Sequence, residues 1–302
     1  MENIQKREYT TKKEFYKTFK RKSQTAELLS RFMKNKTAVI GLVIFAAIVL
    51  MAVCAPLIAD YQKDAINMDI PGKLQPPSAA HILGTDEMGR DIFARVVHGA
   101  RISLRVGITS VAIALLIGGT LGAISGYFGG WLDNIIMRVM DVFLCLPDVL
   151  LALAIIAAFD NSERNIILSI GLAFTPKLSR IVRSAVMGVR TSEYIEAARC
   201  IGARNGHIIL SHVLVNCMGP IIVQVTLYVA NAILTISALS FIGLGISAPT
   251  PEWGNMLATG RAYMRDSVHI VMAPGLAIFF TILSLNLLGD GLRDTLDPRL
   301  KQ

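Results

Sequence analysis

The sequence predicts an all-α membrane protein with six transmembrane helices, and three observations support this. The chain of 302 residues is 53% hydrophobic and only 17% charged, whereas soluble domains carry about 25% charged residues. Its apolar residues gather in long uncharged runs, and about 20 such residues span a bilayer as a helix. The net charge of +8 comes from basic residues that cluster beside these runs. Lipid offers no partner to open backbone, so each spanning segment is expected to be helical.

Residues 1–36 form a basic N-terminal segment, which we place in the cytoplasm because cytoplasmic loops carry an excess of Lys and Arg. Residues 12–36 interleave basic and apolar side chains, which is typical of a helix lying on the anionic inner leaflet. For residues 1–22 a disordered basic tail is the alternative, and we favour it there. The next uncharged run predicts a first transmembrane helix over residues 37–59. It is too long for the apolar part of a secretory signal, so we expect it to be retained.

Residues 60–100 are mixed in charge and contain Pro71, Pro76 and Pro77. They predict an extracytoplasmic loop that ends in a short amphipathic helix from Asp91 onward. Two interpretations of the segment before this helix stay open. In the first, Thr85 or Asp86 caps the helix. In the second, the segment contacts the substrate directly. We prefer the first.

Five further apolar runs predict the remaining spans, at residues 106–132, 135–159, 166–176, 213–251 and 270–289. The run at 213–251 is long enough to hold one span and a following loop. The run at 106–132 carries Gly118, Gly122, Gly126 and Gly130, and a spacing of four places glycines on one helix face, where backbones approach closely. We assign Gly118 and Gly122 to such packing. Gly130 we assign to the turn at 127–130.

The run at 166–176 is short, so hydropathy alone does not establish a span there. Residues 1–36 and 177–204 are both strongly basic, and the positive-inside rule places both in the cytoplasm. An even number of spans must separate them, and three clear runs lie between, so the short run must also cross. The total is then six, with both termini in the cytoplasm. The basic residues of the second segment are Lys177, Arg180, Arg183, Arg190, Arg199 and Arg204.

Asp148 follows Pro147 inside the run at 135–159 and is a candidate residue of a translocation path. Ionisable side chains within membrane helices are functional candidates by default. The alternative is a carboxylate near a water-filled cavity or the cytoplasmic edge that has no transport role. Lys177 in the next span is a conceivable partner, although nothing in the sequence pairs the two.

Residues 194–203 (YIEAARCIGA) connect the fourth and fifth spans on the cytoplasmic side. Glu196, Ala197 and Ala198 favour a helix, and Gly202 is a typical helix stop. A second helix is expected from His207. The segment predicts either a protruding helix whose small residues seat in a partner's groove or an ordinary helical hairpin. The residues alone do not decide between the two.

The same segment resembles the EAA loop of binding-protein-dependent ABC importers, in which E-A-A and three further residues precede a glycine, here Glu196-Ala197-Ala198 and Gly202. Val215 stands where that pattern commonly has a proline, which leaves the start of the fifth span open. Four other segments resemble the C-type permease of dipeptide, oligopeptide and nickel importers. They are residues 83–91 (LGTDEMGRD), 238–245 (ALSFIGLG), 251–257 (PEWGNML) and 286–299 (NLLGDGLRD, then LDPR).

The resemblance implies the transmembrane domain of a type I ABC importer in the cell membrane. It implies a five-helix core over residues 101–291, a coupling loop at about 190–210 and a cytoplasmic tail at 292–302. It implies no cofactor and no catalysis on this chain, because ATP and Mg²⁺ bind two separate cytoplasmic ATP-binding subunits. Glu196, Ala197, Ala198 and Gly202 would dock on those subunits.

Two further partners are implied: a second homologous permease that completes a heterodimer, and an extracytoplasmic solute-binding protein. We expect Thr85, Asp86, Arg90 and Asp91 to help position that binding protein. The expected substrates are di- or oligopeptides, and nickel or another small solute is the alternative.

Other function classes are disfavoured by the sequence. It holds no GxxxxGK[ST], HExxH or GxSxG motif, so we expect no phosphate loop and no catalytic constellation on this chain. Its four cysteines (Cys54, Cys145, Cys200 and Cys217) show no CxxC or zinc spacing and are interpreted as packing residues. Because the basic residues flank apolar runs, we expect no nucleic-acid partner. An ATP-independent channel or secondary transporter is a distant alternative.

Overall fold

The computed structural model describes residues 24–296, and this part of the chain is helical, with one isolated β-bridge between Thr85 and Asp91 as its only strand-like pairing. Its longest helices are α3 (Lys36–Val53), α5 (Ile92–Phe128), α8 (Glu163–Val189), α11 (Leu214–Phe241) and α13 (His269–Leu296). The shorter α-helices are α2 (Gln24–Lys34), α4 (Ala55–Ile58), α6 (Gly130–Leu144), α7 (Asp148–Ala158), α9 (Glu193–Cys200), α10 (Asn205–Ile208) and α12 (Trp253–Gly260). Short 3₁₀ or π turns lie at Tyr61–Ile66, Ile70–Gly72, Ile209–Val213 and Arg261–Tyr263.

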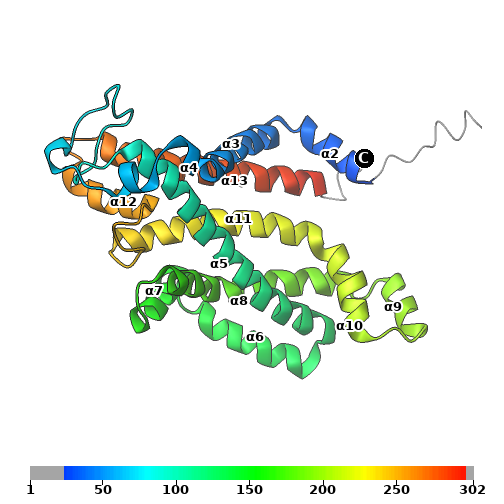
Figure 1. Ribbon diagram of the computed structural model, residues 1–302. Helices are drawn as coiled ribbons and strands as arrows, with labels where there is room; N and C mark the ends of the chain where they lie inside the picture. Colours follow the sequence, from blue (N-terminus) through cyan, green and yellow to red (C-terminus); the bar gives the residue numbers. More distant parts are fainter. Residues whose placement is uncertain (1–23, 297–302) are drawn as a thin grey trace, which may run out of the picture.

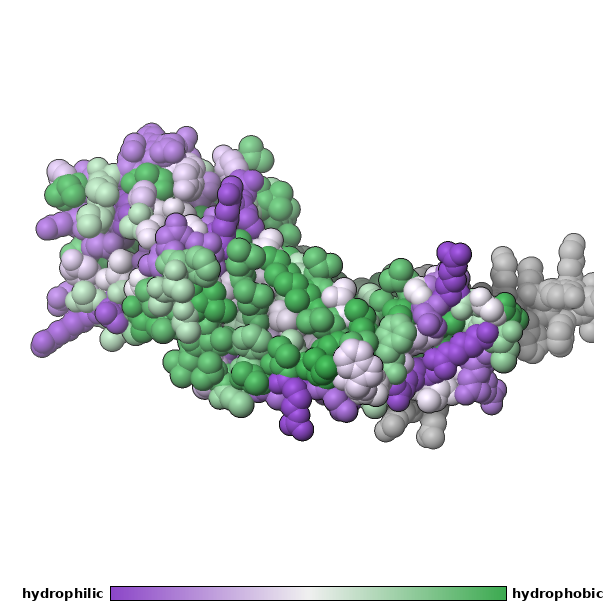
Figure 2. Space-filling view, turned by 90° about the horizontal axis from the view of Figure 1, so that it is seen from below, coloured by the Kyte–Doolittle hydropathy of each residue, from purple (hydrophilic) through white to green (hydrophobic). Residues whose placement is uncertain are grey.

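Five helical stretches of the described chain are long and apolar enough to cross a membrane: α3, α5, α8, α13 and the stretch Asn205–Phe241, which includes α11. The pair α6 and α7 passes the same test together, with a bend of 86° between the two helices. Counted as one crossing, this bent pair brings the number to the six that the sequence predicts. Figure 2 shows the corresponding surface, in which a broad apolar region separates hydrophilic residues at the two ends of the molecule.

The ends of the molecule hold different sets of short elements (Figure 1). At one end lie α9, α10, α2 and the C-terminal end of α13. At the other lie α4, α12 and the loop between α4 and α5. We call these the α9 end and the α12 end. Both limits of the described chain lie at the α9 end, as an even number of crossings requires.

The contact between α5 and α8 depends on glycines. A Cβ atom added to Gly118, Gly122 or Gly126 would lie 2.4, 2.3 or 2.8 Å from a carbonyl oxygen of α8. The oxygens belong to Thr175, Ser179 and Arg183, so the two backbones approach over three successive turns. The prediction for Gly118 and Gly122 is confirmed, and Gly126 joins them. Gly130 has nothing within 4 Å and a φ of +61°, which agrees with the turn assigned to it.

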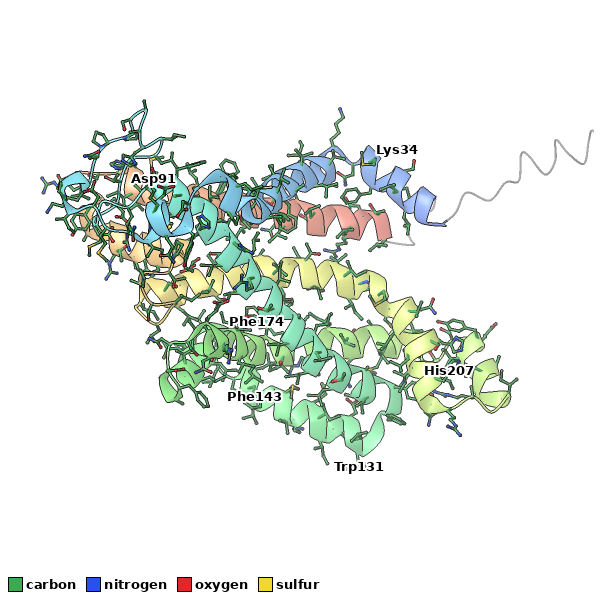
Figure 3. All side chains as sticks on the ribbon, in the orientation of Figure 1. Lys34, Asp91, Trp131, Phe143, Phe174 and His207 are labelled. Atoms are coloured by element: carbon green, nitrogen blue, oxygen red, sulfur yellow. The ribbon has the colours of Figure 1, made fainter. Side chains whose placement is uncertain are left out.

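The main core lies where α5, α8 and α11 meet. Phe174 of α8 is 1% exposed and stands among these helices (Figure 3). It packs in one cluster with Ile170, Ile233 and Ile236. Trp253 at the start of α12 is fully buried in the same cluster, and its Nε1 donates to the Val96 carbonyl of α5 at 2.9 Å. The α12 segment is thereby held against α5.

Several helices are longer than the sequence predicts. The short helix expected from Asp91 is the beginning of the 37-residue α5, because nothing after residue 100 interrupts it. The span expected at 166–176 is the 27-residue α8, which continues through Pro176 and Lys177 to Val189. Acidic partners on α6 and α7 accommodate its basic side chains. The tail expected from residue 292 begins as helix, since α13 extends to Leu296.

The start of the fifth span, left open by the sequence, has no break at Val215. Helical turns run without interruption from Asn205 through the π turn Ile209–Val213 into α11, so Val215 lies in its first turn. At the N-terminal side, α2 and α3 are separate helices. Asn35 caps α3 and also donates to the Asp294 carboxylate of α13 at 3.1 Å. The remainder of the predicted N-terminal helix, the favoured tail at 1–22, and Asp297, Pro298 and Arg299 of the LDPR segment lie outside the described residues.

Candidate functional site

The segment predicted as a coupling loop forms α9, which ends in a defined stop. The Ala203 amide donates to the Ala198 carbonyl at 3.1 Å, and the Gly202 amide donates to the Arg199 carbonyl at 3.0 Å. These two bonds make a Schellman motif, which needs a left-handed residue after the helix. Gly202 supplies it with a φ of +81°. The stop predicted at Gly202 is therefore present, and the chain turns there into α10.

The two faces of α9 differ in burial. Ile195 and Ala198 are 0% and 7% exposed and pack with Val186, Ile208 and Val213 in a second hydrophobic cluster. The opposite face carries these exposed residues: Glu193, Tyr194, Glu196, Ala197, Arg199 and Cys200, followed by Ile201, which is 85% exposed. One face thus anchors α9 to the bundle and the other is open at the end of the molecule.

Of the residues predicted to dock on a partner, Glu196, Ala197 and Gly202 are exposed, whereas Ala198 faces inward. The exposed face of α9 therefore carries fewer small side chains than the sequence suggests. Its exposed Ile201 and Tyr194 add apolar area that a partner's surface can cover.

Tyr127, which the sequence analysis treated only as part of a turn, ties α9 to the end of α5. Its hydroxyl donates to Asn205 Oδ1 at 3.0 Å, and the Arg199 guanidinium lies over its ring at 5.1 Å. Arg190 adds a bond to the Gly126 carbonyl at 2.9 Å. Side chains of α9 and α10 therefore contact the C-terminal end of α5 directly. No motif marks Tyr127, because its partners are 72 or more residues away in the chain.

Three ion pairs join α6 and α7 to α8. Arg183 binds Asp133 through two bonds of 2.6 and 2.7 Å. Arg180 pairs with Asp141, and Lys177 Nζ lies 2.5 Å from Asp148 Oδ2. A charged side chain at the centre of a membrane helix costs about 2.5–3.5 kcal/mol, and pairing offsets part of that cost. The structure thus supplies the partner that the sequence left open for Asp148, and it moves three basic residues from the predicted loop into α8.

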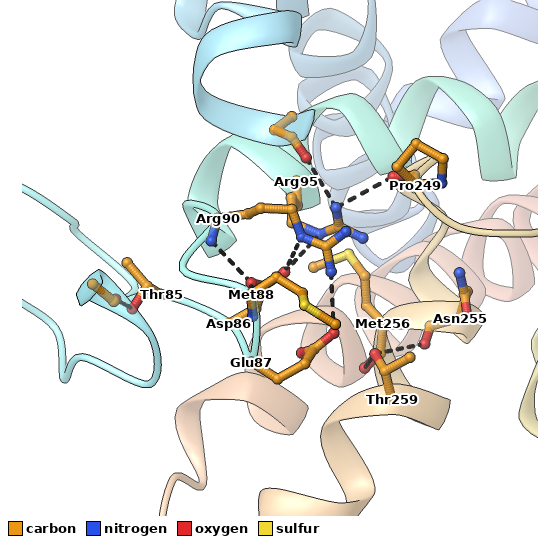
Figure 4. A network of polar contacts seen from close by, with 12 residues as sticks. Thr85, Asp86, Glu87, Met88, Arg90, Arg95, Pro249, Asn255, Met256 and Thr259 are labelled. Atoms are coloured by element: carbon orange, nitrogen blue, oxygen red, sulfur yellow. Dashed lines mark hydrogen bonds and ion pairs between the residues drawn. The ribbon is translucent and has the colours of Figure 1, made fainter. Parts of the chain in front are cut away.

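The outer segment predicted from the LGTDEMGRD motif forms a buried polar network at the α12 end (Figure 4). Asp86 accepts bonds from the Met88 and Arg90 amides and pairs with Arg90 Nε at 2.7 Å. Arg95 of α5 approaches the same carboxylate at 3.3 Å and donates to the Ala65 and Pro249 carbonyls. The network joins the loop before α5 to the loop before α12.

The cap predicted for the helix in this segment was assigned to the wrong residues. Asp91 caps α5, accepting from the Ala94 amide at 2.8 Å, and also pairs with His81. Thr85 instead accepts from the Gln75 amide and donates to the Gly72 carbonyl. Thr85, Asp86 and Arg90 are at most 4% exposed. Their side chains therefore shape the loop from within and present little surface of their own.

Glu252 is a second residue that the sequence analysis did not single out. It is fully buried and caps α12 by accepting from the Gly254 and Asn255 amides, each at 2.8 Å. The Ser103 and Ser240 hydroxyls donate to the same carboxylate at 3.3 and 2.8 Å. Four donors from α5, α11 and α12 therefore converge on one carboxylate, which fixes α12 between two spans.

Comparison with known proteins agrees with this architecture. Residues 118–302 match the family described as binding-protein-dependent transport system inner membrane component, and residues 23–77 match the N-terminal TM domain of oligopeptide transport permease C. The dipeptide transport system permease protein DppC of Alkalihalophilus pseudofirmus is 45% identical, with 91% of this chain and 90% of that protein covered. The di/tripeptide transport system permease protein DppC of Pseudomonas aeruginosa is 42% identical, with 92% and 93% covered.

A chain of the MetNI methionine ABC transporter, solved in an inward-facing conformation, is similar in fold, with a TM-score of 0.56. The likeness covers 67% of this chain and 96% of that chain at 15% identity, so it bears on the fold alone. It agrees with the helical membrane architecture expected of a type I ABC importer. The match over residues 118–302 and the relative that is 45% identical show that the chain belongs to the family of binding-protein-dependent transport system inner membrane components.

Proposed function

We propose that this chain is the permease subunit of an ATP-driven importer of di- or oligopeptides, and that α9 transmits the motion of a separate ATP-binding subunit to the spans. The observation that carries the proposal is the construction of α9. It has one face anchored in the bundle, one face open at the end of the molecule, and a direct connection through Tyr127 to α5. A rigid element placed in this way converts movement of a docked partner into movement of helices.

The rest of the machinery follows from the family. A second homologous permease completes the translocation path, two cytoplasmic subunits bind ATP and Mg²⁺, and an extracytoplasmic protein delivers the substrate. The α9 end is then cytoplasmic, with both chain termini on that side. The α12 end faces the solute-binding protein, and the buried Asp86 network keeps its loops in shape. The peptide substrate is supported by the names of relatives at 42–45% identity.

Replacing a small exposed residue of α9 by a bulky one tests the docking. Ala197 is exposed, so Ala197→Trp leaves the packing of this chain intact but obstructs a close-fitting partner. We expect at least a tenfold weaker association with the ATP-binding subunits, which corresponds to about 1.4 kcal/mol, and a parallel loss of ATP-dependent peptide uptake. Ala80→Trp is the matched control, since Ala80 is also exposed but lies in the loop at the α12 end.

The measurements are co-purification of the ATP-binding subunits with each variant and uptake of a radiolabelled dipeptide into proteoliposomes with and without internal ATP. Unchanged association and uptake in Ala197→Trp would refute the role of α9. Uptake that needs no ATP would indicate a channel or a secondary transporter. Uptake of nickel but not of peptides would overturn the substrate class while leaving the mechanism in place.

A further inference from the structure

One face of α8 carries polar side chains at the depth where a membrane is most apolar. Lys177, Arg180 and Ser184 follow one another at intervals of three and four residues, which places them on one side of a helix. Their side chains are 41% exposed for Lys177 and 54% for Arg180, and Ser184 is also exposed. Lys177 stands 14 residues after Glu163 and 12 before Val189, so about 21 and 18 Å of helix separate it from the two ends of α8.

Hydrocarbon is not a suitable neighbour for this face, because charged side chains in membrane helices face a bundle interior or a water-filled cavity. The opposite side of α8 differs, since Leu168 there is 46% exposed and suits lipid. The charged face of α8 is therefore the side that water or polar protein covers in the assembled transporter.

Asp148 meets Lys177 on this face at the break between α6 and α7. Pro147 precedes the first turn of α7, the two helices bend by 86°, and the carboxylate is 21% exposed. Tyr228 lies on α11, which packs against both α7 and α8. The ring of Phe174 packs edge-on against Tyr228 with centroids 5.4 Å apart. The acidic and the basic group thus come from α7 and α8, and α11 packs against both of these helices.

The Asp148 pair is built differently from the Asp133 pair. Asp133 receives two bonds from the fork of Arg183 and one from Ser125, and its side chain is 14% exposed. Within residues 24–296, Lys177 is the one hydrogen-bonding partner of the Asp148 carboxylate, and Asp148 is the one partner of the Lys177 ammonium. An ammonium carries three donors and a carboxylate about four acceptor positions. The Asp133 carboxylate accepts three bonds and the Asp148 carboxylate only one, so both members of the Asp148 pair keep more free hydrogen-bonding capacity on their exposed sides.

We propose that Asp148 and Lys177 form a subsite in the translocation path for zwitterionic substrates. In it the peptide's ammonium binds Asp148 and its carboxylate binds Lys177. A zwitterion can insert between the two groups without leaving any of the four charges unpaired, so opening the pair needs no isolated charge at mid-membrane. This inference rests on the proposed function, because it names the chemistry by which the same path admits peptides.

The test uses the native Cys145, which is exposed and lies three residues before Asp148, as a reporter in the assembled importer. The other cysteines, Cys54, Cys200 and Cys217, are replaced by Ala. The rate of Cys145 labelling by a membrane-impermeant charged maleimide is then measured with millimolar dialanine or with N-acetyl-dialanine amide, which has the same backbone without terminal charges. We expect dialanine to slow labelling at least threefold and the capped peptide to have no effect.

The double variant Asp148→Asn/Lys177→Gln keeps a hydrogen-bonding pair of nearly the same size but removes both charges. We expect it to lose the protection by dialanine while its labelling rate without peptide stays within twofold. Lys177→Arg, which keeps the charge, should retain protection, and it also serves if the double variant fails to assemble. Leu168→Cys, which places a thiol on the lipid-facing side of α8, should not react at that thiol.

Equal protection by both peptides, protection that survives in the double variant, or no protection in the parent would each overturn the subsite. Failure of Cys145 to react at all would do the same, because it would exclude water from this face. Dipeptide uptake by the parent importer is measured alongside. If the parent imports no dipeptide, the proposed function fails. If it imports dipeptide but shows no charge-dependent protection, only the subsite fails.

Discussion

The close approach of α5 and α8 predicts that Gly122 tolerates no side chain. A Cβ at this position would lie 2.3 Å from the Ser179 carbonyl oxygen, 3.0 Å from the Ser179 carbonyl carbon and 3.0 Å from the Arg183 amide nitrogen. The first distance is about 1.1 Å short of the 3.4 Å at which ordinary contact begins. All three atoms are backbone, so no side-chain rotation relieves the clash and the two helices must separate.

We expect Gly122→Ala to lower the free energy of unfolding by about 1–3 kcal/mol, which is the usual cost of overpacking a well-packed interface. The gain of about 0.8–1 kcal/mol in helix propensity from Gly to Ala offsets only part of the clash. Separation of α5 from α8 also disturbs the support of α9, so ATP-dependent uptake should fall further than the amount of folded protein does.

Gly119→Ala is the matched control in the same helix. A Cβ at Gly119 would meet only the flexible Leu115 side chain, at 3.3 Å, so the substitution gains propensity at little steric cost. Apparent melting temperatures of the two purified variants and the parent are compared in one detergent. We expect Gly119→Ala to equal or exceed the parent and Gly122→Ala to melt lower. Equal stability of the two variants would refute the reasoning from backbone contact.

Three further predictions concern single polar side chains. Asp91→Ala removes the cap of α5, which accepts from the Ala94 amide at 2.8 Å, and should lower stability by about 1 kcal/mol, measured as a lower melting temperature. Glu252→Gln replaces one acceptor oxygen by a donor in a buried site that offers four donors, so we expect a loss of about 1–3 kcal/mol and a lower yield of folded protein. Tyr127→Phe removes the bond to Asn205 but keeps the ring beneath the arginine; we expect near-normal stability with reduced peptide-stimulated ATP hydrolysis by the assembled importer.

Each of these predictions has its own control. Asp91→Asn keeps an acceptor for the cap and should recover most of the stability. Glu193→Gln makes the same chemical change as Glu252→Gln at an exposed position of α9, and it should leave yield unchanged. Tyr127→Leu removes both contacts and should uncouple more strongly than Tyr127→Phe. If the two Tyr127 variants hydrolyse ATP at the parent rate, the connection between α9 and α5 has no role in coupling.

Helix α8 is longer than the hydropathy of its sequence predicts. A span was expected to stop at Lys177 because a lysine is costly in lipid, yet α8 continues to Val189. Its three basic side chains pair with Asp133, Asp141 and Asp148, and these partners lie 29 to 50 residues away. The count of six crossings nevertheless agrees with the structure when the bent pair α6 and α7 is counted as one crossing. It depended on which side the basic segments face, and Arg190, Arg199 and Arg204 at the α9 end satisfy that argument without Lys177.

In the loop before α5, the local sequence motif likewise did not identify the residue that caps the helix. The sequence analysis predicted that Thr85 or Asp86 caps the following helix. Asp91 caps α5, whereas Thr85 and Asp86 turn inward to bind backbone and arginine groups. The loop geometry that selects among them depends on Arg95 and Pro249, one of which lies more than 150 residues further along the chain.

By itself, the sequence determined the helical membrane architecture, the number of crossings, the glycine contact surface of α5 and the position of the helix stop at Gly202. The number of crossings follows from composition and from the placement of the basic segments. The glycine surface and the helix stop follow from periodicity and backbone preference, which act within a few turns of helix. Only the tertiary structure decided that Ala198 faces inward while Ala197 faces out, that Tyr127 holds α9, and that Asp148 meets Lys177. Each of these depends on which distant side chain fills the space beside a residue, and the sequence of one helix does not specify which residues from elsewhere in the chain pack against it.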